Sequence, residues 1–496
     1  MKARQPIAAL LLIAMLSAAA CGSQADTPVD PTAGSDTTTT TEAVTESTRL
    51  EADIPADADY EGYEFRVLSR AKAGSWENYD IEIESSNGEV INDALYERNQ
   101  TVEELLNVKF KQIPVNGYDV KTPANTSIMS GSDDYDIIMP SITDAANFAQ
   151  NGMLTPLQEL PYMNLENPWY DQRCIEELQV NGKNYMFFSD ITVRNLDAIW
   201  IYLFNKQIID DYQLEDPYEL VTSGKWTTEK MTEMCKAVTN DVNGDTKMDK
   251  SDSWGLVAHD YVITAGYVGS GERIATADKN GEITLTMNNQ RIYDVIDSLI
   301  VLQDYWIRYS LTAKKYSAAA PVGFEPSDNY AELLSVFKAG NALFIGECMA
   351  VMSDMRDSDI EFGVVPTPKL DEDQDGYYSA VNYIAASMCV PKTVTNLERT
   401  SVIIEAWAAE SHYTVIPAYY EIAMKSKYAR DTVTSEMLDL ILGSRSYDLG
   451  IYYGWGGLSD RFCSLVYEAS TDFASMYDAN KGTAQDALDT FTKNFE

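Results

Sequence analysis

The acidic stretch DVNGDTKMDKSD, Asp241 to Asp252, spaces its oxygen-bearing side chains as an EF-hand calcium loop does. Loop positions one, three, five, nine and twelve are Asp241, Asn243, Asp245, Asp249 and Asp252, and the backbone carbonyl of Lys247 stands at position seven. Two positions depart from the pattern, because Thr246 replaces the usual glycine and Asp252 replaces a longer, bidentate glutamate. The spacing predicts a structural Ca2+ site, and the alternative is a solvated acidic turn.

The residues around this loop exclude two larger interpretations. An EF-hand sensor needs a helix after the loop, but the WGLVA that follows has the apolar character of a strand. A docking module of the dockerin type needs a second repeat, and the sequence contains none. We therefore expect a single calcium-type loop that connects a helix to a strand.

Histidine is too scarce for most metal and nucleophile chemistry. The sequence has only His259 and His412, which excludes a multi-histidine zinc site and leaves a His-dependent triad only these two to use. It has no nucleophile elbow, phosphate-binding loop or dinucleotide fingerprint. The 77 acidic residues could supply a pair of catalytic carboxylates, but no motif marks such a pair.

The composition favours a small, neutral or cationic ligand. The 37 basic and 77 acidic residues give a formal net charge of −40, which disfavours binding to nucleic acids and anionic lipid surfaces. Tyrosine outnumbers phenylalanine, 31 to 14, and tyrosine and tryptophan rings suit the apolar faces of sugars. A chain of 496 residues is too long for one compact core, so we expect two or three domains or lobes.

The amino-terminal residues predict an exported and anchored protein. Residues 1–20 combine Lys2 and Arg4 with a short apolar run, as a signal peptide does. The sequence AAAC places Cys21 where a lipobox has its lipidated cysteine, and the alternative is cleavage of a plain secretory signal. Residues 21–59 are rich in Thr, Asp, Pro and Ala and predict a flexible linker. We therefore expect an extracytoplasmic protein attached to the cell membrane through Cys21.

Strands and helices alternate through the rest of the chain. Apolar runs, several of them alternating with polar residues, predict strands at 63–68, 108–113, 253–258 and 342–346. Apolar residues at helical spacing predict helices at 91–107 and 291–308. This order is typical of an α/β fold with mostly parallel sheets, and the carboxyl-terminal part is expected to be mainly helical.

Five segments together resemble the extracellular solute-binding proteins of family 1, the lipoprotein receptors of ABC importers that mostly take up carbohydrates. These segments are GEVINDALYERNQTVEELLNVKF, YDIIMPSITDAANFAQNGMLTPL, YLFNKQIIDDYQLEDPYEL, FKAGNALFIGECM and YSAVNYIAASMCVPKTVTNLERTSVIIEAWAAES. Their order and spacing carry the resemblance, which covers nearly all of the chain after the linker.

The resemblance implies a two-lobed, periplasmic-binding-protein-like α/β fold, with a ligand cleft between the lobes and hinge segments that cross between them. Lobe 1 would comprise 60–195 and 356–411, and lobe 2 would comprise 196–355 and 412–496, with carboxyl-terminal helices. The last crossing would lie near His412.

The same resemblance nominates the residues of a ligand site. Lobe 1 would contribute Arg70, Trp76, Ser141, Asp144 and Asn382, and lobe 2 would contribute Tyr261, Glu347 and Trp455. Trp455, in GIYYGWGGLSD, corresponds to a loop that supplies a sugar-stacking ring and is the strongest single candidate. The alternative for each aromatic residue is packing in a core.

The resemblance further implies a binding protein without catalysis and without a required cofactor. It would capture a carbohydrate, an oligosaccharide above all, by lobe closure and deliver it to ABC permease subunits, and we expect a monomer. The first alternative is a surface-anchored glycoside hydrolase with paired carboxylates. The second is a receptor that serves a sensor in place of a transporter.

Overall fold

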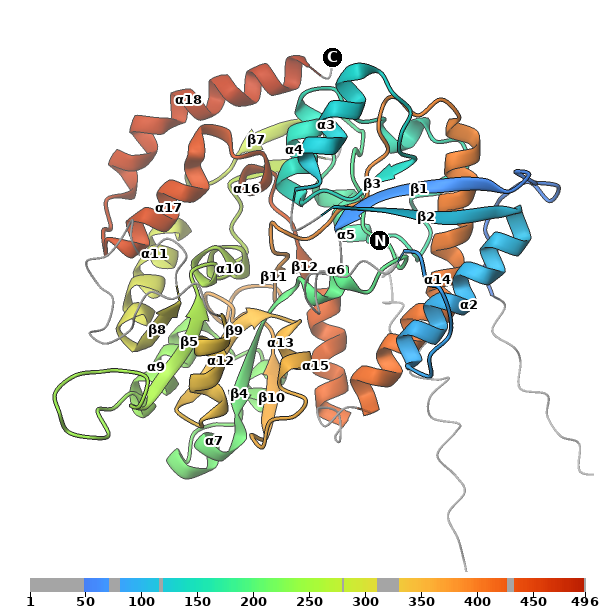
Figure 1. Ribbon diagram of the computed structural model, residues 1–496. Helices are drawn as coiled ribbons and strands as arrows, with labels where there is room; N and C mark the ends of the chain where they lie inside the picture. Colours follow the sequence, from blue (N-terminus) through green and yellow to red (C-terminus); the bar gives the residue numbers. More distant parts are fainter. Residues whose placement is uncertain are drawn as a thin grey trace, which may run out of the picture. The chain divides into compact units, whose positions relative to one another are not determined.

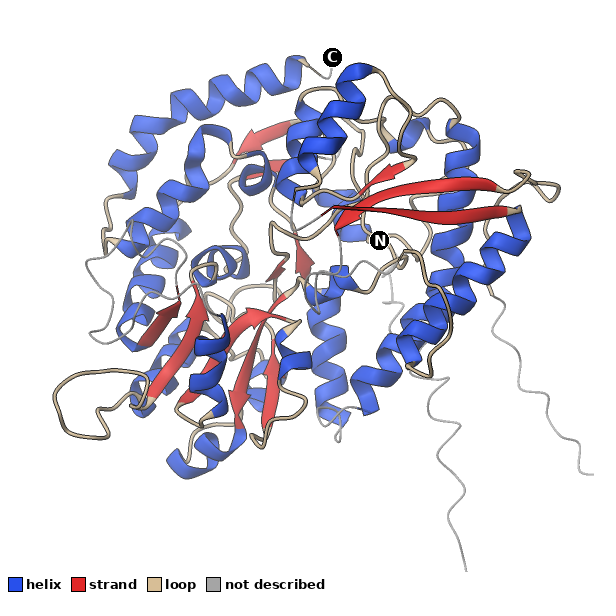
Figure 2. Ribbon diagram, in the orientation of Figure 1, coloured by secondary structure: helices blue, strands red, loops and turns tan. Residues whose placement is uncertain are grey.

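The structure, a computed structural model, describes residues 49–70, 81–115, 119–278, 281–309, 330–425 and 432–494. Residues Ala52–Glu496 belong to one unit, and Figures 1 and 2 show its two main sheets with the helices around them. None of the helices in the described ranges is long and apolar enough to cross a bilayer.

The first sheet is small and parallel. It consists of β1 (Tyr63–Arg70), β2 (Val108–Val115) and β3 (Ile137–Ile138), in the order β2-β1-β3. β2 alternates buried and exposed residues, as expected for a strand with one face in the core. The strands predicted at 63–68 and 108–113 are confirmed, and so is the helix predicted at 91–107, which is α2 (Val90–Leu106).

Aromatic packing joins this sheet to two helices. Phe110 of β2 stacks on Trp407 of α14 (Leu397–Lys425), with ring centroids 4.3 Å apart. Arg98 of α2 places its guanidinium carbon 5.0 Å from the centre of the Trp407 ring, within cation–π range. α2 and α14 consequently lie against each other beside the sheet (Figure 1).

The second sheet has five strands and holds the larger core. Its strands are β4 (Trp200–Asn205), β5 (Trp254–His259), β8 (Trp306–Tyr309), β9 (Ala342–Cys348) and β10 (Phe362–Val365), in the order β10-β4-β9-β5-β8. The pairs β9-β5 and β5-β8 are parallel, whereas β4 runs antiparallel to both of its neighbours. The strands predicted at 253–258 and 342–346 are confirmed as β5 and β9.

Two of the predicted lobe boundaries do not coincide with a division between the described elements. The range 356–411 was assigned to lobe 1, but β10 pairs with β4 and so belongs to the second sheet. A boundary was expected at His412, but α14 continues through this residue as one helix. The assignment of β10 depends on its pairing with β4, which a short apolar run does not reveal, and the division of the chain into lobes stays a prediction.

The helix predicted at 291–308 is too long. α11 (Arg291–Leu302) is followed by a 3-10 turn, η2 (Gln303–Tyr305), and the chain then enters β8. β8 adds an edge to the sheet by pairing in parallel with β5. Trp306 and Ile307 are residue types that favour strands, and this pairing decides their conformation.

The remaining elements cover the sheets and connect them. The helices before the carboxyl-terminal region are α3 (Lys121–Ser130), α4 (Ile142–Gln150), α5 (Gln172–Glu177), α6 (Arg194–Asp197), α7 (Lys206–Tyr212), α8 (Pro217–Thr222), α9 (Thr228–Val238), α10 (Val262–Gly269), α12 (Tyr330–Lys338) and α13 (Val351–Asp354). The short strands are β6 (Ala275–Ala277), β7 (Ile283–Leu285), β11 (Ser379–Ala380) and β12 (Arg445–Ser446), and η1 spans Leu157–Glu159. After α14 come α15 (Thr432–Gly443), α16 (Leu449–Tyr453), η3 (Trp455–Gly457), α17 (Leu458–Tyr467) and α18 (Phe473–Lys493), as the predicted helical ending requires.

Candidate functional site

Residues 381–386, here called the junction segment, contact two candidate residues from the first sheet. Nη2 of Arg70 donates a hydrogen bond to the carbonyl oxygen of Ile384, at 2.7 Å. Ser141 forms an antiparallel bridge with Ala386. These contacts attach the junction segment to the ends of β1 and β3.

The same segment contacts candidate residues from the second sheet. Tyr261 donates a hydrogen bond from its hydroxyl to the carbonyl of Val381, at 3.0 Å. Asn382, itself a candidate and buried, places Nδ2 at 3.4 Å from Sγ of Cys348, the residue after Glu347. The junction segment thus gathers Arg70, Ser141, Tyr261 and Asn382 directly and brings Glu347 close to them.

The candidate residues at the junction segment lie at or just after the ends of strands. Arg70 is the last residue of β1, and Ser141 precedes α4 shortly after β3. Glu347 is the penultimate residue of β9, and Tyr261 follows the end of β5. Open α/β sheets bind ligands outside the carboxyl ends of their strands, so this position is the one at which the fold would hold a ligand.

Ser141 and Asp144 have structural partners of their own. Oγ of Ser141 accepts a hydrogen bond from the Asp144 N–H (3.1 Å) and caps the amino end of α4, and it also lies 3.0 Å from Oδ2 of Asp144. Oδ1 of Asp144 forms an ion pair with Nζ of Lys121 at 2.9 Å. These two residues therefore order the amino end of α4 near the junction segment.

Three aromatic side chains form a row at the second sheet. The ring of Tyr261 lies 5.5 Å from that of Trp200 and 5.7 Å from that of Tyr383. Tyr261 and Trp200 are buried, and burial raises the pKa of the Tyr261 hydroxyl well above its usual value. Tyr383 is 41 % exposed and is therefore the accessible member of the three. Sequence reasoning missed Tyr383 and Trp200, although Tyr383 directly follows the nominated Asn382.

Glu347 is a half-buried carboxylate in this group. Its Oε1 accepts a hydrogen bond from the Cys348 N–H at 2.8 Å. Burial raises the pKa of the Glu347 carboxyl to about 7, and the charge of nearby Asp354 adds to the rise. Near neutral pH this side chain therefore changes readily between its neutral and its charged form.

Trp455 does not belong to this group, and its packing favours the alternative of a core residue. The side chain is only 2 % exposed and stacks on Tyr453, with centroids 5.3 Å apart, while Phe491 of α18 lies 5.1 Å away. A Cβ atom on the neighbouring Gly456 would lie 2.7 Å from Cβ of Ala484, which shows how closely η3 approaches α18. Trp455 therefore packs in a core between η3 and α18. Trp76, another nominated residue, lies outside the described residues.

The acidic loop connects α9 to β5, as predicted, and its side chains bond to its own backbone. Oδ1 and Oδ2 of Asp241 accept hydrogen bonds from the N–H groups of Gly244 (2.7 Å) and Thr246 (2.8 Å). Thr246 has a φ of 68°, the left-handed conformation that glycine supplies at this loop position. Among the described residues, no three His, Cys, Asp or Glu side chains converge as a metal site requires. Calcium binding at this loop therefore stays a prediction.

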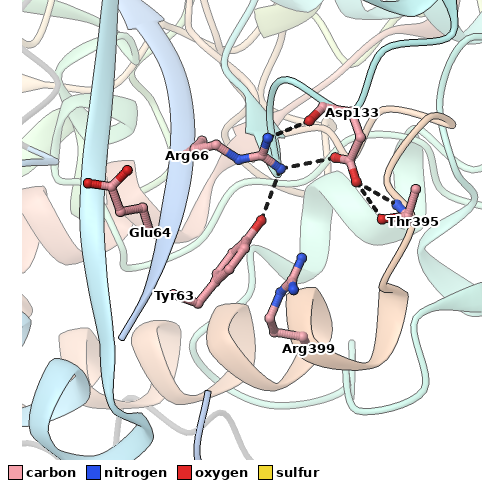
Figure 3. A pocket seen from close by; sticks show the side chains of 6 residues that line it. All are labelled: Tyr63, Glu64, Arg66, Asp133, Thr395 and Arg399. Atoms are coloured by element: carbon pink, nitrogen blue, oxygen red, sulfur yellow. Dashed lines mark hydrogen bonds and ion pairs between the residues drawn. The ribbon is translucent and has the colours of Figure 1, made fainter. Parts of the chain in front are cut away.

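A separate pocket of about 470 Å³ lies at the amino end of β1 (Figure 3). It is lined by Tyr63, Glu64, Arg66, Asp133, Thr395 and Arg399, none of which was nominated. Nη2 of Arg66 donates to Oδ1 of Asp133 (3.0 Å) and to the Tyr63 hydroxyl (2.9 Å), and the guanidinium carbon of Arg399 lies 3.4 Å from the centre of the Tyr63 ring. Arg66 forms an ion pair with Asp133, Arg399 forms one with Asp136, and the pocket lies at the opposite end of β1 from Arg70.

The sequence matches no protein-family model and no curated protein. Solved structures, in contrast, match over most of the chain. A sugar transporter from Rhizobium etli in an open conformation has a TM-score of 0.54 at 15 % identity, covering 87 % of this chain and 98 % of that one. UgpB from Mycobacterium tuberculosis in complex with glycerophosphocholine has a TM-score of 0.55 at 15 % identity, covering 87 % and 99 %. An ABC substrate-binding protein from Listeria monocytogenes in complex with cycloalternan has a TM-score of 0.51 at 13 % identity, covering 88 % and 99 %.

At these identities the likeness establishes the fold. The chain has the two-lobed, periplasmic-binding-protein-like α/β fold that the resemblance implied.

Proposed function

We propose that this protein is the extracytoplasmic solute-binding component of an ABC transporter, which captures a carbohydrate and delivers it to permease subunits. The observation that carries the proposal is the junction segment, where candidate residues of both sheets meet at the carboxyl ends of strands. Ligand captured there would contact both lobes and so favour their closed arrangement, which is how binding drives closure in this fold.

The chemistry at the junction segment suits a sugar. Tyr383 is an accessible aromatic residue, and the half-buried Glu347 has a carboxyl group that can exchange hydrogen bonds with hydroxyls. The three solved structures include a sugar transporter and complexes with glycerophosphocholine and cycloalternan. A small hydroxyl-rich solute, such as an oligosaccharide or a polyol, is therefore the class we propose.

We further propose that Cys21 anchors the protein to the outer face of the cell membrane. The anchor would hold the receptor near its permease, and the linker at 21–59 would keep the folded part clear of the bilayer. Replacing Cys21 with serine should release the protein into the soluble fraction or leave it uncleaved. Equal membrane retention of wild type and variant in a fractionation experiment would contradict the lipid anchor.

The binding proposal is tested by calorimetric titration of the full-length protein with a panel of oligosaccharides and polyols. Tyr383→Ala should weaken binding of the best ligand by about tenfold or more, since loss of an aromatic anchor at a binding hot spot costs about 2 kcal/mol. Tyr212→Ala is the matched control, because Tyr212 is similarly exposed (44 %) but stands at the end of α7, outside the junction group. If the Tyr383 variant binds the ligand with unchanged affinity, the junction segment is not part of the ligand site.

The same samples test the hydrolase alternative. A binding protein returns its ligand unchanged after long incubation, whereas a glycoside hydrolase shortens it. Chromatography of the incubated ligand separates the two outcomes. Shortened product that also disappears in Glu347→Gln would replace the binding proposal with the enzymatic one.

A further inference from the structure

The pocket at the amino end of β1 contains an arginine whose hydrogen-bond donors are unused. Arg399 stands in the first turn of α14, and its guanidinium carbon lies 3.4 Å from the centre of the Tyr63 ring. Its Nε is buried without a hydrogen-bond partner, and its Nη2 lies 3.7 Å from Oδ1 of Asp136, which is an ion pair but too long for a hydrogen bond. The Arg399 guanidinium therefore donates no hydrogen bond to another described residue (Figure 3).

The second arginine of the pocket satisfies the neighbouring carboxylates instead. Nε of Arg66 donates to Oδ2 of Asp136 at 3.0 Å, and its Nη2 donates to Oδ1 of Asp133, also at 3.0 Å. The Tyr63 hydroxyl donates to Oδ1 of Asp136 at 2.8 Å. The Thr395 N–H donates to Oδ2 of Asp133 at 3.1 Å. Every carboxylate oxygen of these two aspartates thus has a hydrogen-bond donor without the guanidinium on α14.

The pocket carries no local excess of negative charge, unlike the whole chain, whose formal net charge is −40. The two arginines balance the two aspartates, and Glu64, the other acidic residue of the lining, points away from the other five side chains (Figure 3). Arg399 also stands at the amino end of α14, where the helix dipole is positive. The pocket can therefore accept an anion although the rest of the surface is acidic.

The position of the Arg399 guanidinium fits a carboxylate group. At 3.4 Å from the Tyr63 ring centre the guanidinium lies flat against the ring, which holds it in one orientation. Because Nε is buried, the edge that remains for a ligand is the one formed by Nη1 and Nη2, and such an edge matches the two oxygens of a carboxylate. The pocket, about 470 Å³ in volume, has room for a small molecule beside this edge.

We infer that this pocket binds the carboxylate group of a small organic acid, with Arg399 as the residue that pairs with it and Tyr63 as the ring that orients the guanidinium. The pocket and the junction segment lie at opposite ends of β1. The acid is therefore a second ligand, distinct from the solute proposed for transport, and the inference goes beyond the proposed function.

The inference is tested by calorimetric titration of the full-length protein with acetate, lactate, succinate and glutarate, at pH 7 and low salt to limit screening. At least one of these acids should bind, whereas succinamide, which has amides in place of both carboxylates of succinate, should not. Inorganic phosphate is titrated as a non-planar anion. The inference is overturned if none of the acids binds, if succinamide binds as tightly as succinate, or if phosphate binds at least as tightly as the best acid.

The variants locate the site of binding. Arg399→Gln and Arg399→Lys should each weaken binding of the best acid by at least tenfold, because glutamine removes the charge and lysine lacks the planar pair of donors. Arg356→Gln is the matched control and should bind as wild type does, since Arg356 is an exposed arginine that follows α13 and does not line the pocket. If Arg399→Gln binds the acid as tightly as wild type, the acid binds elsewhere and the inference is wrong. The comparison of succinate with succinamide on wild-type protein holds even if the Arg399 variants do not fold.

Discussion

Tyr261 and Tyr452 donate hydrogen bonds from their hydroxyls to a single acceptor, the carbonyl oxygen of Val381, at 3.0 Å and 2.8 Å. Tyr261 follows β5 and Tyr452 belongs to α16, so the shared acceptor holds the second sheet and a carboxyl-terminal helix against the start of the junction segment. Burial raises the pKa of both hydroxyls, which keeps them protonated as donors across the physiological range.

Removal of these hydroxyls should show strong coupling. Tyr261→Phe and Tyr452→Phe should each lower the free energy of unfolding by about 1 kcal/mol, because one donor remains for the Val381 carbonyl. The double variant should lose more than the sum, since it leaves a buried carbonyl without a partner, at a cost of about 1 to 3 kcal/mol. Urea unfolding of the four proteins measures the cycle. If the free-energy changes of the two single variants add up to that of the double variant, the two hydroxyls do not act on the same carbonyl.

Trp455→Ala should destabilise the protein without a specific effect on ligand affinity. The ring packs between Tyr453 and Phe491 and is nearly inaccessible, so truncation should cost about 3 to 5 kcal/mol of unfolding free energy. Denaturant unfolding and ligand titration on the same preparation measure both quantities. If the variant keeps normal stability but loses ligand affinity, Trp455 belongs to the ligand site.

Glu347 should make the stability of the unliganded protein fall as pH rises. Its pKa is about 7 in the folded chain and 4.5 as the ordinary value, so between these pH values the folded state binds more protons than the unfolded state. The stabilising contribution of the neutral form is complete below pH 4.5 and lost by about pH 7. Relative to Glu347→Gln, wild type should lose about 1 to 3 kcal/mol over this window. A difference that stays constant with pH would contradict the raised pKa.

The acidic loop should bind Ca2+ weakly, with Kd on the order of 10⁻⁴ M as in other extracellular modules. Saturation at about one hundred times Kd would add roughly 2.7 kcal/mol of stability and raise the melting temperature. Thermal unfolding with calcium and with chelator measures the shift, and the variant Asp241→Ala/Asp245→Ala should abolish it. If calcium raises the melting temperature of the variant as much as that of the wild type, it binds at another site. If calcium does not shift the melting temperature of the wild type, the loop is a solvated acidic turn.

Local patterns in the sequence were sufficient for several of the individual elements, although not for β8, which was predicted as the end of a helix. The alternation around Val108 and Phe110 and the helical spacing of 91–107 depend on neighbours within a few residues, so they could be recognised without the fold. The helix–loop–strand context of the acidic loop was also correct, because the apolar WGLVA that follows it does not fit a helix. For the ligand site, the resemblance named Arg70, Ser141, Tyr261 and Asn382, which the junction segment brings together.

Only the tertiary structure decided which elements meet and which side chains remain accessible. Trp455 and Tyr383 both follow small or polar residues in loop-like sequence, yet one is 2 % and the other 41 % exposed. The difference arises from α18, which packs over η3 and covers Trp455, whereas no such element covers Tyr383 to the same extent. Burial and strand pairing are set by contacts between residues far apart in the chain, such as β10 with β4, and local sequence carries no record of those distant partners.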